Sequence, residues 1–90
     1  MTDTKTNRHG DEIRTGQLWT DDPRRTVIRT LRIDNLDDAG SLGAVAICTV
    51  VRAHDTDTGE VVAPGRVVSI NIDRLHTTAA GNGYRLAESR

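Results

Sequence analysis

Alternating hydrophobic and polar positions mark the clearest extended segments of the chain. Leu31 and Ile33 share one face of a strand over residues 26–34, and polar side chains occupy its other face: Thr30, Arg32 and Asp34. The same period recurs over residues 66–72, with Val68, Ile70 and Ile72 predicted inward and Val67, Ser69 and Asn71 outward. Both patterns are typical of half-buried antiparallel strands.

The segment from residue 44 to residue 54 is apolar on both faces of its predicted strand. One face carries Val45, Ile47 and Val51, and the other carries Ala46, Cys48 and Val50. Such a strand is either central in its fold or has one face against a partner. Ala46, Cys48 and Val50 therefore form a candidate partner or dimer face. The alternative is a central strand covered by a loop or by a tightly curled barrel.

Shorter segments complete the set of elements. Residues 16–20 and 84–86 predict short strands, residues 61–63 a return strand interrupted by Pro64 and Gly65, and residues 73–76 a single helical turn. Loops or turns are expected over residues 21–25, 35–43, 55–60 and 79–83, where Gly, Pro, Asp and Asn gather.

These elements predict a mostly β fold, a small five-stranded antiparallel SH3-like barrel or curled sheet with at most a short helical turn before the last strand. The β domain is expected over residues 16–86. Residues 1–15 are predicted to be a disordered tail, since Ile13 is their one strongly apolar residue after Met1, and residues 87–90 a frayed end. The architecture places the first and last strands side by side, which would bring Trp19 towards Tyr84.

Composition limits the core and the partners of the domain. The chain has 90 residues, 36% of them hydrophobic, and a net charge of −1, so bulk basicity cannot hold a nucleic acid. Trp19 and Tyr84 are the only aromatic residues, and their main predicted role is to fill the core. Their alternative role is an aromatic ledge that binds a ligand.

Several short motifs resemble one group of proteins. Gly16-Gln17-Leu18-Trp19, Asp22-Pro23-Arg24-Arg25 and Gly83-Tyr84-Arg85-Leu86 are similar to segments of small uncharacterised proteins of actinobacteria and of the phages that infect them, as are Leu31-Arg32-Ile33 and Ile70-Asn71-Ile72-Asp73-Arg74-Leu75. The resemblance spans residues 16–86. It implies a phage or actinobacterial origin and a small β fold, and it transfers no activity and no site residue.

No catalytic or metal-binding motif is predicted from the titratable residues. Asp55, Asp57 and Thr58 spell D-x-D-T, which is similar to the D-x-D-x-T nucleophile motif of aspartate-dependent phosphatases, but the chain is too short for the α/β sheet that this chemistry needs. Asp55, Asp57 and Glu60 could coordinate calcium only weakly, because they do not supply all the ligand positions of a calcium-binding loop. His9, His54 and His76 lack metal-ligand spacing, and Cys48 is expected to be a buried, inert thiol. We therefore expect no cofactor, no metal and no enzyme activity.

The densest basic stretch contains Arg24, Arg25, Arg29 and Arg32, which are candidate nucleic-acid contacts. Against this, Arg29 and Arg32 should point to opposite faces of a regular strand, and Asp21, Asp22 and Asp34 flank the stretch as ion-pair partners. A solvated surface is the favoured interpretation.

The sequence thus favours a non-catalytic binding or regulatory module that binds a protein partner or forms a homodimer. For a phage-encoded protein, which the resemblance implies as one origin, the partner would be a host protein. The alternative is a nucleic-acid-binding small β-barrel that uses the arginine-rich region. An enzyme subunit and a virion component rank lower. No membrane segment and no small-molecule substrate are expected, and the cytoplasm, the host's for a phage protein, is the expected compartment.

Overall fold

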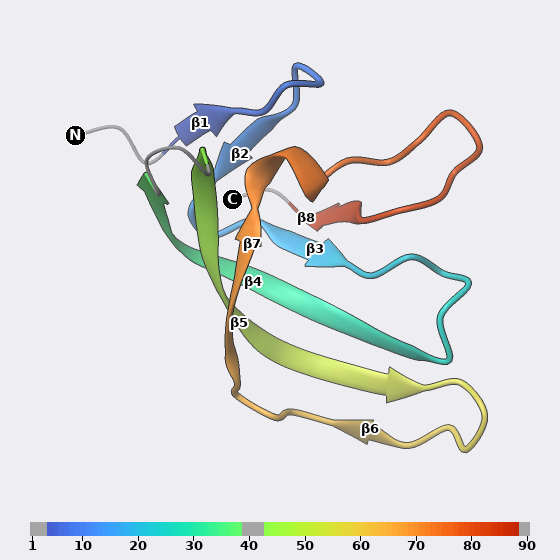
Figure 1. The fold of residues 1–90 in the computed structure, drawn as a ribbon. Helices are drawn as coiled ribbons and strands as arrows, with labels where there is room; N and C mark the ends of the chain where they lie inside the picture. The colour runs from blue at the N-terminus through green and yellow to red at the C-terminus, as the bar shows by residue number, and fades with distance from the viewer. Residues whose placement is uncertain (1–3, 39–42, 89–90) are drawn as a thin grey trace.

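The computed structural model describes residues 4–38 and 43–88, which form eight strands and one short 3-10 helix (Figure 1). The elements in chain order are β1 Thr4–Thr6, β2 Glu12–Arg14, β3 Leu18–Thr20, β4 Val27–Asp38, β5 Ala44–Asp55, β6 Val61–Val62, β7 Val67–Asn71, η2 Ile72–Arg74 and β8 Arg85–Glu88. None of the helical segments in these ranges is long and apolar enough to cross a membrane.

The main sheet is antiparallel and runs in the order β6-β5-β4-β3-β8, with β7 also paired to β5. This confirms the mostly β prediction, the short helical turn before the last strand and the pairing of the first and last strands of the β domain. The path ends at β8 on one side and at β6 and β7 on the other, so among the described residues the sheet does not close into a barrel.

Strand β5 joins two parts of the molecule. Its residues 45–49 pair with β7, and Ala53 and His54 pair with β6, so β6 and β7 follow the same edge of β5. Pro64 interrupts this edge, and Gly65 N donates to Val50 O (3.0 Å) where the pairing resumes. We call the part beyond this interruption, residues 27–30, 52–55 and β6, the arm; it projects away from the rest of the sheet in Figure 1.

The core lies on the concave face of the sheet. The alternating strand positions Leu31, Ile33 and Ile70 are at most 5% exposed, as the sequence predicted. The other buried hydrophobic residues are Ile13, Trp19, Ala46, Cys48, Val50, Ile72 and Leu75, and Tyr84 packs against this cluster. The core is therefore aliphatic with one indole. The loop predicted over residues 35–43 begins later, because β4 continues to Asp38, and residues 39–42 lie outside the described part.

The disordered tail predicted for residues 1–15 is wrong for residues 4–15. Strands β1 and β2 pair as a hairpin (Figure 1) with Lys5 opposite Ile13. The Ile13 side chain is completely buried. Asn7, in the turn, is also buried, and its Nδ2 donates to the carbonyl oxygens of Ile72 (3.1 Å) and Leu75 (2.9 Å). One apolar side chain and one buried amide therefore hold the hairpin against η2 and the core.

The candidate partner face on β5 is also corrected. Ala46, Cys48 and Val50 are at most 2% exposed in the single chain, because they face the core. They are not available to a partner, and the alternative of a covered central strand is the one observed. Val45 and Ile47 lie on the opposite face of β5 and are half-buried.

The Cys48 thiol is expected to be unreactive in the folded protein. Burial, with a smaller effect of the Asp34 carboxylate, raises its pKa to about 11, and the reactive species is the thiolate. A thiol reagent such as dithionitrobenzoate at pH 8 should label the native chain slowly and the urea-unfolded chain within the mixing time. Rapid stoichiometric labelling of the native protein would contradict this placement.

Candidate functional site

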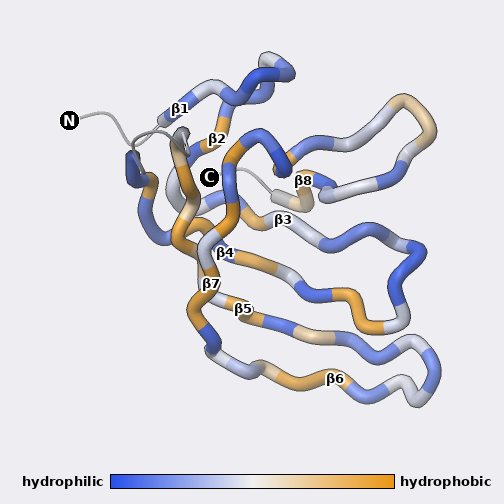
Figure 2. The backbone as a smooth tube through the Cα atoms, in the orientation of Figure 1, coloured by the Kyte–Doolittle hydropathy of each residue, from blue (hydrophilic) through white to orange (hydrophobic). Residues whose placement is uncertain are grey.

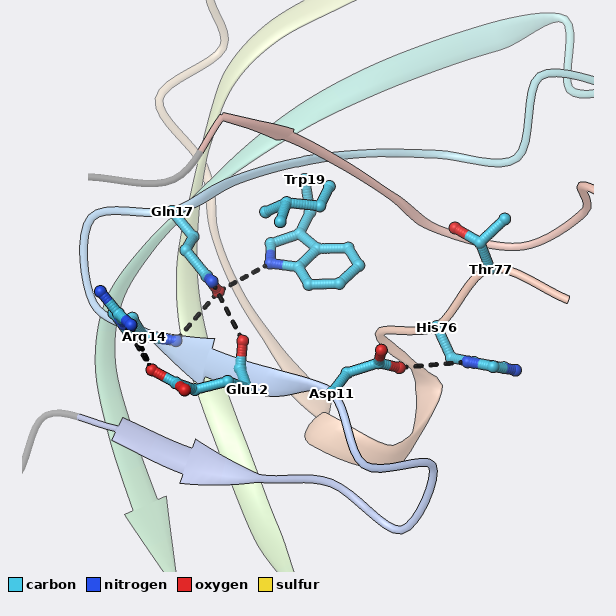
Figure 3. Close-up of a pocket in the computed structure, with 8 residues that line it drawn as sticks. Asp11, Glu12, Arg14, Gln17, Trp19, His76 and Thr77 are labelled. Carbon is cyan, nitrogen blue, oxygen red and sulfur yellow. Dashed lines mark hydrogen bonds and ion pairs between the residues drawn. The ribbon is translucent and has the colours of Figure 1, made fainter.

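A cleft opens between the hairpin and the last strand, and we call it the hairpin cleft. It has a volume of about 380 Å³, and Figure 3 shows its polar rim around the Trp19 indole. Its walls come from β2, β3, β8 and the segment after η2: Asp11, Glu12, Arg14, Gln17, Trp19, His76, Thr77 and Leu86. Trp19 is only 4% exposed, so it forms the floor of the cleft.

Gln17 organises one end of the hairpin cleft. Its Nε2 donates to Glu12 O (3.0 Å), and its Oε1 accepts from Arg14 N (2.9 Å) and from Trp19 Nε1 (3.1 Å). The side-chain amide thus occupies the donor and acceptor positions that a neighbouring strand would fill along β2. The same group also satisfies the buried indole N–H, so hairpin and floor are held in one orientation (Figure 3).

Replacing Gln17 by leucine should lower the free energy of unfolding by about 2 kcal/mol, because two backbone groups and the indole N–H lose their partner while the apolar volume is kept. Urea unfolding followed by Trp19 fluorescence measures the change. Gln17→Glu keeps the shape and the two accepted hydrogen bonds, but it replaces the donated bond with a buried carboxylate oxygen against Glu12 O, so it should also lower stability. Equal stability of all three proteins would contradict the role given to the amide.

One ion pair and one hydrogen bond form the rim of the hairpin cleft. Glu12 pairs with the Arg14 guanidinium, and Asp11 Oδ2 lies 3.1 Å from His76 Nδ1. All four side chains remain between 32% and 52% exposed, so each pair is open to solvent and contributes little to stability. The rim presents both signs of charge to a ligand.

His9 and His76 contribute to the contact between the hairpin and the segment around η2. The His9 and His76 rings stack with centroids 3.7 Å apart, and His9 Nε2 lies 3.1 Å from the backbone oxygen of Asp73. The Asp73 carboxylate accepts from Arg8 N (2.8 Å). His54 lies on β5 opposite Ile28 and takes no part. These contacts position the wall of the cleft that carries His76.

The other wall is strand β8, which pairs with β3 alone among the described residues. Leu86 lies opposite Trp19 in this pairing and is 47% exposed. Before β8, Thr77 Oγ1 donates to Tyr84 O (2.6 Å), and Thr77 forms an isolated bridge with Gly83. Gly83 has φ +87°, and a Cβ there would lie 2.6 Å from His76 O, so only glycine fits this close approach.

The two residues of the predicted aromatic ledge have separate positions. Trp19 is in the cleft floor and Tyr84 is half-buried against the core, so Leu86 is the exposed apolar neighbour of the indole. Several cleft residues belong to the hairpin and were missed because that segment was predicted to be disordered. The signal in the sequence was the polar–apolar–polar triplet Glu12-Ile13-Arg14 after a glycine-bearing turn.

The four candidate nucleic-acid arginines each have a carboxylate close by. Arg24 pairs with Asp22 (2.8 Å), Arg29 with Asp21 (2.8 Å) and Arg32 with Asp34 (2.7 Å), while Arg25 lies 4.0 Å from Asp21. The hydrogen bond from Arg24, with further bonds from the backbone N–H groups of residues 24 and 83, lowers the pKa of Asp22 below its ordinary value. Three carboxylates thus offset most of the positive charge of the four arginines.

The candidate metal and phosphatase residues do not assemble into a centre. Asp55 Oδ1 accepts from the backbone N–H of Asp57 (2.9 Å) and Thr58 (3.3 Å), so it organises a hairpin turn. Across residues 4–38 and 43–88, no group of three or more His, Cys, Asp or Glu side chains could hold a metal ion. Comparisons with protein-family models, curated proteins and solved structures find no match to the chain.

Proposed function

We propose that the protein is a non-catalytic binding module that holds an extended segment of a protein partner in the hairpin cleft. The observation that carries the proposal is the edge of β8 that no other described strand pairs with, beside the indole-floored cleft. An extended segment can add to such an edge through main-chain hydrogen bonds, while side-chain pockets give selectivity. Leu86 and Trp19 provide the apolar contact, and the polar pairs of the rim provide polar ones.

The architecture supports the same proposal. We consider the sheet an opened SH3-like arrangement in which β3 and β8 lie side by side, and small barrels of this kind commonly bind peptides. For a phage-encoded protein, one origin that the resemblance implies, the partner is a host protein in the cytoplasm. The alternative of nucleic-acid binding has less support, because each of its candidate arginines lies near a carboxylate.

The test compares capture by three tagged proteins: the native chain, Leu86→Asp and Val67→Asp. Both positions are exposed, at 47% and 67%, but only Leu86 lines the hairpin cleft. Actinobacterial lysate is treated with nuclease, and the retained proteins are identified by mass spectrometry. We expect one protein to be retained by the native chain and by Val67→Asp, and lost with Leu86→Asp.

Two results would overturn the proposal. The first is equal retention by Leu86→Asp and the native chain, since binding would then lie outside the cleft. The second is a nuclease-sensitive complex together with a mobility shift of nucleic acid at low salt, which would assign the function to the arginines instead.

A further inference from the structure

A second concavity lies where the arm meets the start of β7, and it shares no lining residue with the hairpin cleft. It has a volume of about 360 Å³, at the lower end for ligand sites. The side chains around it are Val27, Arg29, Val50, Ala53, Pro64, Arg66 and Val68. In Figure 2 the neighbouring strand β6 and the start of β4 are coloured as hydrophobic. We call this concavity the arm site.

The two arginines of the arm site differ in charge balance. Asp21, which is buried, holds Arg29 through Oδ2 to the backbone N–H (2.9 Å) and to Nε (2.8 Å). Arg66 forms no ion pair within the part of the chain that the structure describes. One guanidinium charge is therefore left unbalanced at the rim of an apolar concavity.

The backbone fixes the position of Arg66. Val50 N donates to Arg66 O (2.8 Å), and Gly65 N donates to Val50 O (3.0 Å), so this stretch is held against β5. The same bonds use the polar backbone groups at this point of the arm site, which leaves fewer partners for the main chain of a bound peptide. A ligand here must interact mainly through an apolar body and one negative charge.

We propose that the arm site binds a free carboxylic acid with a short aliphatic chain. A guanidinium fork matches a carboxylate geometrically, and the apolar lining residues are valine, alanine and proline. The absence of an aromatic side chain among these lining residues gives nothing for a nucleobase to stack on. The aliphatic chain packs on Val27 and Val68, which are more exposed than Val50, and the carboxylate lies at Arg66.

The experiment is a titration of the full ¹⁵N-labelled chain with octanoate, followed by amide chemical shifts. We expect saturable shifts at Ala53, Arg66 and Val68 and none at Thr77 or Leu86. Arg66→Gln should weaken binding about tenfold, as expected for loss of one charge-assisted hydrogen-bonded contact. Binding should also weaken as salt is added, because the site is open to solvent.

Arg52→Gln is the matched control. Arg52 is an exposed arginine next to Ala53 along β5, so it points to the opposite face of the strand, and its loss should change the affinity by less than about twofold. Octylamine and inorganic phosphate, one lacking the negative charge and the other the aliphatic chain, should not compete. Leu86→Asp should bind octanoate normally, so this inference and the proposed function can fail separately.

The inference is overturned by any of three results. The first is the absence of saturable shifts with octanoate, and the second is an equal loss of affinity in Arg52→Gln and Arg66→Gln. The third is competition by inorganic phosphate, which would assign the site to phosphate groups. The amide spectra of the two variants also report whether the fold is retained.

Discussion

Replacing Asp21 by alanine is expected to lower the free energy of unfolding by about 3 kcal/mol. Its side chain is only 1% exposed and accepts hydrogen bonds from the backbone N–H, Nε and Nη2 of Arg29. Removing the carboxylate leaves a guanidinium, itself only 30% exposed, without its counter-charge, and leaves a strand N–H without its acceptor. The carboxylate also raises the pKa of Arg29 above its ordinary value.

Urea unfolding of the native protein, Asp21→Ala and Asp21→Asn measures this effect. The asparagine variant keeps the shape and one acceptor oxygen, so it should be less destabilised than the alanine variant. Asp22→Ala is the comparison for an adjacent acid whose partner, Arg24, is 69% exposed, and its change should be smaller than that of Asp21→Ala. A change below about 1 kcal/mol in Asp21→Ala would contradict a stabilising role for the buried pair.

Replacing Ile13 by alanine is also expected to cost about 3 kcal/mol, within the range for removing a buried aliphatic side chain. Ile13 is completely buried although it lies on a three-residue strand near the start of the chain. Ile13→Val removes a single methylene and should cost about 1 kcal/mol. Val67→Ala, at a position 67% exposed, is the control and should change stability by less than about 0.5 kcal/mol.

The Ile13 series separates two descriptions of the N-terminal segment. A hairpin docked on the core predicts graded losses in the order alanine, then valine. A disordered segment predicts the same unfolding midpoint for all three proteins, because a side chain in water in both states contributes nothing to the difference. Identical midpoints would therefore contradict the docked hairpin.

The long strands could be predicted from the sequence because each has several alternating positions. Leu31 and Ile33 in β4, and Ile70 with Ser69 in β7, follow the expected faces. A period of two shows which residues share a face of the strand. It does not show which of the two faces points inward when both are apolar. In β5 that choice depends on tertiary packing.

The hairpin and the cleft could not be predicted in the same way. Strands β1 and β2 have three residues each, too few for periodicity to separate them from a polar tail. These strands are held in place by long-range contacts. The Asn7 amide, for example, donates to the carbonyl oxygens of Ile72 and Leu75, which lie 65 and 68 residues later in the chain. The candidate site was missed with the hairpin, because Asp11, Glu12 and Arg14 form one of its walls.

The Gln17 amide has a consequence for self-association. Exposed strand edges are where copies of a β protein stack onto one another and begin to form fibres. On the side of β2 away from β1, the Glu12 carbonyl and the Arg14 amide are already bonded to a side chain of the same molecule. A second copy would have to displace that glutamine before it could add there, so this edge of the hairpin resists strand addition by a bond that also orients its indole neighbour.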